Sequence, residues 1–207
     1  HTQREIEQSL QAGAYRNTPV RVVPNTVEMD SLLKIPVLPK APKHRPLRAG
    51  MLSSNLPKKG LADAEVLAGL LSQAGSDIEL ILVGPETEAL QALLKRQADN
   101  RSAANITYHG YVDEPSGVLA ELDVVINLSH FQESFGRTVL EAMAAARPVV
   151  AYDWGALSEL VVPGETGYLA PLGEVEAVAG YLQQLARTPE RICELGCAGR
   201  ARARRYF

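Results

Sequence analysis

Cysteine, long apolar runs and excess charge are all scarce in this 207-residue chain, and each shortage excludes a class of protein. The two cysteines, Cys193 and Cys197, share an expected helix, and we interpret them as reduced thiols in a reducing compartment, because half a metal site would lack its second ligand pair. No run of about eighteen uncharged apolar residues occurs, and the N-terminal residues show no signal-peptide pattern, so we expect neither a membrane span nor secretion. The net charge of -3 gives no general reason to expect nucleic-acid binding.

What the chain does contain is a regular alternation of apolar runs and helical patterns. Hydrophobic residues make up 46% of it, which is enough to build a core. The expected strands are 47–52, 78–83, 106–108, 124–126, 148–151 and 167–169. The expected helices are 61–74, 86–98, 114–121, 155–161, 174–186 and 189–207, with another that begins near Ser134. This order predicts an α/β fold with a doubly wound parallel sheet of the Rossmann-like kind.

Such a sheet binds ligands at the carboxyl ends of its strands, which directs attention to the loops there. These loops are 53–60, 84–86, 109–112, 131–137 and 153–159. Within the helix 61–74, the apolar residues expected on the inward face are Val66, Leu67, Leu70, Leu71 and Ala74.

Residues 131–151, FQESFGRTVLEAMAAARPVVA, organise the rest of the chain. Two carboxylates, Glu133 and Glu141, have seven residues between them, and this spacing corresponds to about 12 Å along a helix axis. With Ser134 as N-cap, the amides of the next three residues would form an anion site at the helix end, and Gly136 would let a ligand approach the backbone. The two carboxylates could then hold hydroxyls on either side of a bound anion, as a sugar–diphosphate–nucleoside requires. The alternative is that Glu133 caps the helix and Glu141 is solvated.

The segment ESFGRTVLEAMAAARPVVA resembles the E-x7-E signature of retaining GT-B glycosyltransferases of family 4. In that family the signature lies in the C-terminal domain, which binds the nucleotide sugar. The resemblance implies that Glu133 binds the donor sugar and that Glu141 binds the ribose hydroxyls. It also implies that the segment between them holds phosphate or sugar, through Ser134, Phe135, Gly136, Arg137 and Thr138.

Other loops match the same family less closely. The segment SSNLPKKG, residues 53–60, stands where the family carries an arginine and a lysine that clamp the diphosphate. Lys59 aligns with that lysine, and Ser53 stands at the position of the arginine. The resemblance implies that Lys59 neutralises the leaving diphosphate. Gly84 lies in a loose match to a glycine-rich turn, and the segment Gly110, Tyr111 and Val112 matches the family segment beside the base.

Three neighbouring side chains have simpler interpretations. We expect His109 and His130 to be structural histidines. Trp154, in a loop where Ala156 replaces a family glycine, is expected to shield that loop rather than stack on a ligand.

The N-terminal part differs in composition from the rest. Residues 1–13 read as a short polar helix, 20–23 as a short strand, and residues 36–46 contain four prolines among basic residues, which is typical of a semi-rigid linker. We interpret 1–23 as the remnant of an N-terminal domain, 24–46 as the interdomain linker and 47–207 as the nucleotide-sugar-binding domain.

The resemblance implies a cytoplasmic enzyme that transfers a sugar from a UDP- or GDP-linked donor to an acceptor hydroxyl with retention, within cell-envelope polysaccharide synthesis. The missing N-terminal domain would bind the acceptor. No cofactor and no metal are expected, because Lys59 and the helix end supply positive charge.

Several alternatives stay open. The chain could be a non-catalytic nucleotide-binding module, an interpretation that Ser53 favours, or another GT-B enzyme such as a sugar-nucleotide epimerase. A phosphorylase would need a pyridoxal-phosphate lysine, for which no segment is evident. Five arginines in the last helix suit the helix dipole, with peripheral membrane contact as the alternative: Arg191, Arg200, Arg202, Arg204 and Arg205.

Overall fold

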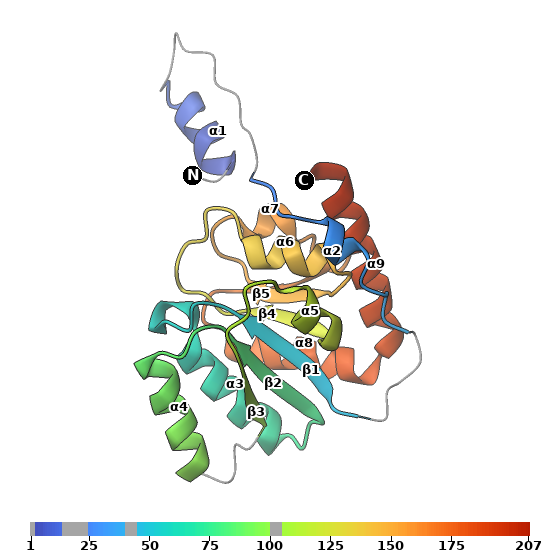
Figure 1. The fold of residues 1–207 in the computed structure, drawn as a ribbon. Helices are drawn as coiled ribbons and strands as arrows, with labels where there is room; N and C mark the ends of the chain where they lie inside the picture. The colour runs from blue at the N-terminus through green and yellow to red at the C-terminus, as the bar shows by residue number, and fades with distance from the viewer. Residues whose placement is uncertain (1–2, 14–24, 40–44, 100–104) are drawn as a thin grey trace.

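The computed structural model describes residues 3–13, 25–39, 45–99 and 105–207. The last two of these ranges form a layered α/β fold around one parallel sheet (Figure 1). The strands are β1 Leu47–Leu52, β2 Ile78–Val83, β3 Ile106–Gly110, β4 Val124–Asn127, β5 Val149–Tyr152 and β6 Gly167–Ala170. The helices are α1 Gln3–Gln11, α2 Asp30–Leu33, α3 Leu61–Gln73, α4 Glu88–Asp99, α5 Ser116–Glu121, α6 Arg137–Ala144, α7 Leu157–Leu160, α8 Val175–Arg187 and α9 Pro189–Tyr206, with a 3-10 turn, η1, at Pro57–Lys59.

The strand order β3-β2-β1-β4-β5-β6 reverses direction between β1 and β4. Every strand pairing is parallel, and Ala49 and Gly50 of β1 pair with Val124 and Val125 of β4. The predicted doubly wound fold is therefore confirmed. The loops that follow β1 and β4 diverge at this switch point, which is where such sheets bind ligands.

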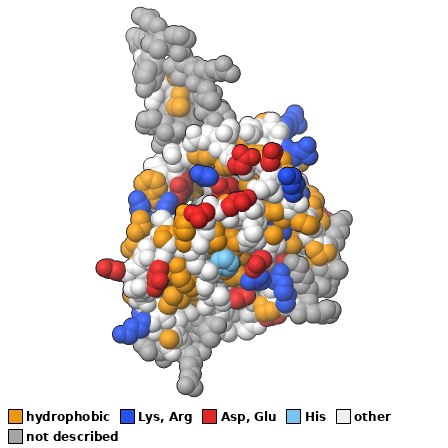
Figure 2. Space-filling view, viewed as in Figure 1, with side chains coloured by type: hydrophobic (Ala, Val, Ile, Leu, Met, Phe, Trp, Pro, Cys, Tyr) orange, Lys and Arg blue, Asp and Glu red, His pale blue; other side chains and the backbone are white. Residues whose placement is uncertain are grey.

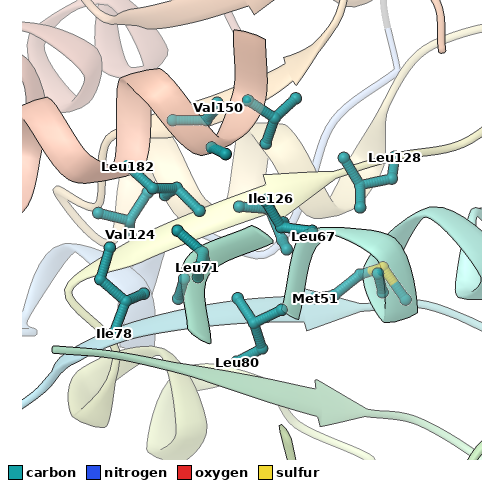
Figure 3. Packing of buried hydrophobic residues seen from close by; sticks show 14 of the residues in the cluster. Met51, Leu67, Leu71, Ile78, Leu80, Val124, Ile126, Leu128, Val150 and Leu182 are labelled. Atoms are coloured by element: carbon teal, nitrogen blue, oxygen red, sulfur yellow. The ribbon is translucent and has the colours of Figure 1, made fainter. Parts of the chain in front are cut away.

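Alternate strand residues enter two apolar clusters, one on each face of the sheet. On one face, Leu80, Ile126 and Val150 pack against α3, α4 and α8 (Figure 3). On the other face, Ile81, Val125 and other strand residues pack against α5, α6 and α7. Burial on both faces explains why the strands are nearly continuous apolar runs.

Two details of the predicted helices were wrong. Val66 is exposed, and the buried face of α3 is formed by Leu61, Ala64, Leu67, Ala68 and Leu71. The helices α4, α5 and α7 each begin two residues later than predicted.

The proline-containing segment is not a free spacer where the structure describes it. Leu32, Ile35 and Leu38 are buried against the domain. The buried guanidinium of Arg147 donates to the carbonyl of Pro36, and Arg200 donates to that of Ile35 at 2.7 Å. Residues 25–39 therefore pack as part of this domain, while the predicted strand at 20–23 lies outside the described residues.

Most of the arginines of α9 bind groups of the protein itself. Arg200 donates to the carbonyl of Ala144, Arg202 donates to that of Leu160, and Arg191 pairs with Glu194. Within the described ranges, no helix is both long enough and apolar enough to cross a bilayer. Acidic and basic side chains are interspersed on the face shown in Figure 2, so that face has no broad basic surface.

Candidate active site

A cavity of about 560 Å³ opens at the switch point, between the carboxyl ends of β1, β2 and β4 and the start of α6. Most of the residues predicted for the site line it: Ser53, Lys59, Gly84, Tyr111, Val112, Glu133, Gly136, Arg137, Thr138 and Glu141. Ser134, Phe135 and Gly110 are not among the lining residues. The topology therefore brings together four loops that are far apart in the sequence.

The loop after β1 is fixed directly against the loop after β4. Gly60 has φ of 85°, and a Cβ there would lie 2.1 Å from the carbonyl oxygen of Leu128, so only glycine fits. The carbonyl of Lys58 accepts hydrogen bonds from the backbone N–H groups of His130 and Phe131, at 2.9 and 3.2 Å. These contacts place Lys59 beside the segment that carries Glu133.

Lys59 and Glu133 form an ion pair inside the cavity. The distance from Lys59 Nζ to Glu133 Oε1 is 2.5 Å, and the two side chains are 20% and 18% exposed. The backbone of Glu133 is held from behind, since its carbonyl accepts the N–H of Ala156 at 2.8 Å and Gly155 packs too closely to admit a Cβ. Both charged groups are thus pre-positioned on a rigid wall.

The helix α6 begins at Arg137, later than predicted, and Ser134 is not its N-cap. Gly136 occupies that position with φ of 87°, in the left-handed region, and a Cβ there would lie 2.6 Å from Leu157. Backbone shape and packing on α7 therefore both require a glycine here, and Gly136 also lines the cavity.

This later start changes which amides face the cavity. The amides of Arg137 and Thr138 open the helix and have no acceptor within it. Phe135 is partly buried and packs against the apolar cluster, where its ring meets that of Phe207 with centroids 6.0 Å apart.

Arg137 and Glu141 form a second ion pair on the cavity wall. Arg137 Nε lies 2.8 Å from Glu141 Oε1, and the side chains are 74% and 7% exposed. Burial raises the pKa of the Glu141 carboxyl, and the Arg137 guanidinium opposes that rise. The alternative in which Glu141 is solvated is therefore wrong.

Ser53 lies at the cavity, but its hydroxyl is used within its own turn. The Oγ donates to Asn55 Oδ1 at 3.1 Å and accepts the N–H of Asn55 at 3.0 Å. Asn55 is buried and donates in turn to the carbonyl of Pro85. Gly84 packs on the carbonyl of Ser53, where a Cβ would approach to 1.9 Å. This corner of the cavity is rigid and uncharged.

Near the predicted Tyr111, the cavity lining contains residues that sequence reasoning missed, among them Asp113 and Pro115. Tyr111 itself is highly exposed. Asn127, the last residue of β4, lines the floor and accepts the N–H of Ser129 at 3.1 Å. A polar residue that ends an apolar strand run was the available signal for Asn127, and the position of Asp113 next to Val112 was the signal for that carboxylate.

Behind the cavity, His130 is bonded within the protein. Its Nε2 lies 2.7 Å from Asp63 Oδ2, and the same oxygen accepts the hydroxyl of buried Tyr152 at 2.5 Å. Burial and Asp63 raise the pKa of Tyr152. The indole N–H of Trp154 donates to the carbonyl of His130 at 3.2 Å. This cluster braces the loop that carries Glu133.

Comparison with known proteins identifies the family of this chain. The model of the family described as glycosyl transferases group 1 matches residues 49–188. The chain is 32% identical over 187 residues to a phosphatidyl-myo-inositol mannosyltransferase of Mycobacterium leprae, covering 89% of this chain and 49% of that protein. It is 30% identical to the putative glycosyltransferase EpsD of Bacillus subtilis, over 75% of this chain and 39% of that one. The chain therefore belongs to the group 1 glycosyltransferase family, and it spans about half the length or less of these curated relatives.

Solved structures support the same fold. HepE of Anabaena, in complex with UDP, superposes with a TM-score of 0.80 at 23% identity, over all of this chain and 58% of that one. The C-terminal domain of a group 1 glycosyl transferase from Francisella tularensis gives a TM-score of 0.66 at 22% identity, over 78% of this chain and 87% of that one. The Rossmann-like domain is thus of the GT-B kind.

Proposed function

We propose that this chain is the donor-binding domain of a retaining glycosyltransferase, which transfers a sugar from a nucleoside diphosphate sugar to an acceptor hydroxyl. The observation that carries the proposal is the pair of ion pairs on one cavity wall, Lys59–Glu133 and Arg137–Glu141, on either side of the start of α6. Each pair offers a carboxylate for hydroxyl groups and a cation for phosphate.

The roles of the groups follow from their positions. Glu133 would accept hydrogen bonds from the donor sugar, and buried Glu141 would accept them from the ribose. Lys59 and the amides of Arg137 and Thr138 would stabilise the charge that develops on the diphosphate as the glycosidic bond breaks. Because these groups are fixed before the donor arrives, they need little reorganisation during the reaction. We propose that no metal is needed.

The acceptor would be bound by a second domain, since the chain spans about half of its first curated relative. Closure of two domains over a donor excludes water and orients the acceptor. We therefore expect the 207-residue chain alone to transfer sugar much more slowly than a chain with both domains. Cys193 and Cys197 are thiols rather than halves of a disulfide, which fits a cytoplasmic location, and exposed Arg204 and Arg205 could contact an anionic membrane surface.

Calorimetric titration of UDP, GDP and ADP into this chain, with EDTA present, tests the proposal. We expect one of them to bind, and Lys59→Ala to weaken that binding by about 1.5–3 kcal/mol, as the loss of a charge-assisted hydrogen bond would. The alternative favoured by the locked hydroxyl of Ser53 is a non-catalytic nucleotide module, for which Glu133→Gln would change nothing with a sugar-bearing donor. Failure of every nucleotide to bind would contradict both functions.

A further inference from the structure

The cavity is short of positive charge for a diphosphate ligand. Among the described residues that line it, the cationic side chains are Lys59 and Arg137, whereas Glu133, Glu141 and Asp113 are acidic. Lys59 is already in contact with Glu133. The partial charge at the start of α6 adds only about half a unit. A diphosphate therefore needs a second full cation.

Position 53 does not supply it. The family pattern has an arginine there, but Ser53 donates its only hydroxyl hydrogen to Asn55 Oδ1. The surrounding backbone is closely packed, with the carbonyl of Ser53 against Gly84. Even the weak neutral donor at this corner is thus engaged elsewhere.

Arg137 has the geometry that the missing cation requires. It is the first residue of α6, so its side chain and the free amides of the first turn belong to the same corner of the cavity. Its Nε is bonded to Glu141, and among the described residues no partner bonds its two Nη groups. A guanidinium is a planar fork that can hold a carboxylate through one edge and donate to a phosphate through another.

We propose that the guanidinium of Arg137 is the second cation on the donor diphosphate and that it replaces the arginine which the family pattern places at position 53. This inference rests on the proposed function and assigns a role to a side chain that the family pattern does not use. While Nη donates to phosphate, Nε can keep its hydrogen bond to Glu141 Oε1.

Titration of UDP and GDP into the wild type, Arg137→Gln and Arg96→Gln tests this role. Arg96 is an exposed arginine that pairs with Glu65 away from the cavity, so it is the matched control. We expect Arg137→Gln to weaken the bound diphosphate at least about tenfold at low salt, with a smaller difference at high salt, because charge-assisted hydrogen bonds are lost. Arg96→Gln should change nothing. The free nucleoside, followed by ligand-observed NMR, should bind both variants and the wild type equally.

A rescue experiment separates a phosphate role from an indirect effect on Glu141. Ser53→Arg should change diphosphate affinity little in the wild type but restore most of the loss in Arg137→Gln. Equal diphosphate affinity of the wild type and Arg137→Gln would overturn the inference, as would an equal loss of nucleoside affinity or a failed rescue. If the wild type binds none of the nucleotides, the proposed function fails and this inference fails with it. Unchanged thermal melting of each variant confirms that folding is not the cause.

Discussion

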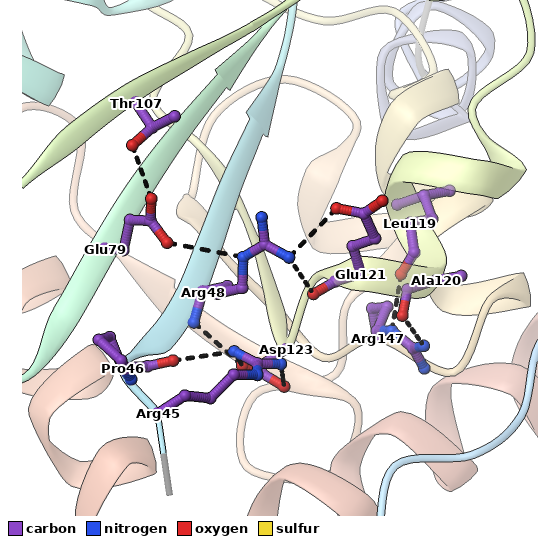
Figure 4. A network of polar contacts seen from close by, with 10 residues as sticks. All are labelled: Arg45, Pro46, Arg48, Glu79, Thr107, Leu119, Ala120, Glu121, Asp123 and Arg147. Atoms are coloured by element: carbon purple, nitrogen blue, oxygen red, sulfur yellow. Dashed lines mark hydrogen bonds and ion pairs between the residues drawn. The ribbon is translucent and has the colours of Figure 1, made fainter. Parts of the chain in front are cut away.

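The two ends of the sheet use the same residue types in opposite ways. At the amino ends of the strands, Asp123 accepts two bonds from Arg45, at 2.8 and 3.1 Å, and a third from the N–H of Arg48 at 3.0 Å (Figure 4). At the carboxyl ends, Glu133 and Glu141 each have one cation and face an open cavity. Charged pairs alone therefore do not mark a site. A site is indicated by a carboxylate that can still accept hydrogen bonds from groups inside a cavity.

Removal of Asp123 should have the largest effect. Asp123→Ala leaves the guanidinium of Arg45 and the N–H of Arg48 without their acceptor, at a place where the aspartate side chain is only 6% exposed. We expect a loss of about 3 kcal/mol in the free energy of unfolding, measured by urea denaturation. Asp113→Ala, at the other end of the sheet, is the control and should unfold like the wild type. Similar losses for both variants would mean that the two ends do not differ.

The two cavity carboxylates should affect binding more than stability. Glu141→Gln should weaken the free nucleoside diphosphate by about 1.5–3 kcal/mol, because the ribose contact does not need the sugar. Glu133→Gln should weaken only the sugar-bearing donor. It also releases Lys59, so the affinity for the free diphosphate should stay equal or increase. Calorimetry that found the same loss of diphosphate affinity in both variants would refute this division.

The sequence predicted the fold and the cavity lining well because both depend on periodic, local signals. Apolar runs placed the strands, and the switch point then followed from parallel topology. Lys59, Glu133 and Glu141 were singled out because the segments that carry them resemble the motifs of a known family, whereas the spacing of the two glutamates alone left open that Glu133 caps a helix and Glu141 is solvated.

What the sequence missed depends on contacts between distant residues. The start of α6 is set by Leu157 packing where Gly136 lacks a Cβ, so the good capping residue Ser134 was misleading. The carbonyl of Ile35 accepts a hydrogen bond from Arg200, which lies at the other end of the chain. The pairing of Arg137 with Glu141 could have been read from their i,i+4 spacing.

Glu141 should give a smaller, pH-dependent effect. Burial raises its pKa in the folded protein above the ordinary value of 4.5. The folded state therefore holds this proton more tightly than the unfolded state, so the stability linked to it is present at low pH and lost as the pH rises through the folded pKa. Urea unfolding of the wild type and Glu141→Gln at several pH values should show the variant gaining relative stability as the pH rises from below 4.5. The opposite slope would mean that Arg137 lowers the pKa of Glu141 by more than burial raises it.

The smallest effect should come from the outer part of the network at the amino ends of the strands. The Arg48 guanidinium lies 3.1 Å from Glu121 and 3.6 Å from Glu79, and all three side chains are substantially exposed (Figure 4). Solvent screens such pairs, so Arg48→Met should lower the free energy of unfolding by less than about 1 kcal/mol. The backbone N–H of residue 48 still reaches Asp123, which leaves the buried centre of the network intact. Nucleotide affinity should not change, because these residues do not line the cavity. If Arg48→Met lowered the free energy of unfolding as much as Asp123→Ala does, the network would act as one unit. The network would then differ from the cavity ion pairs in how many groups it connects, rather than in how deeply they are buried.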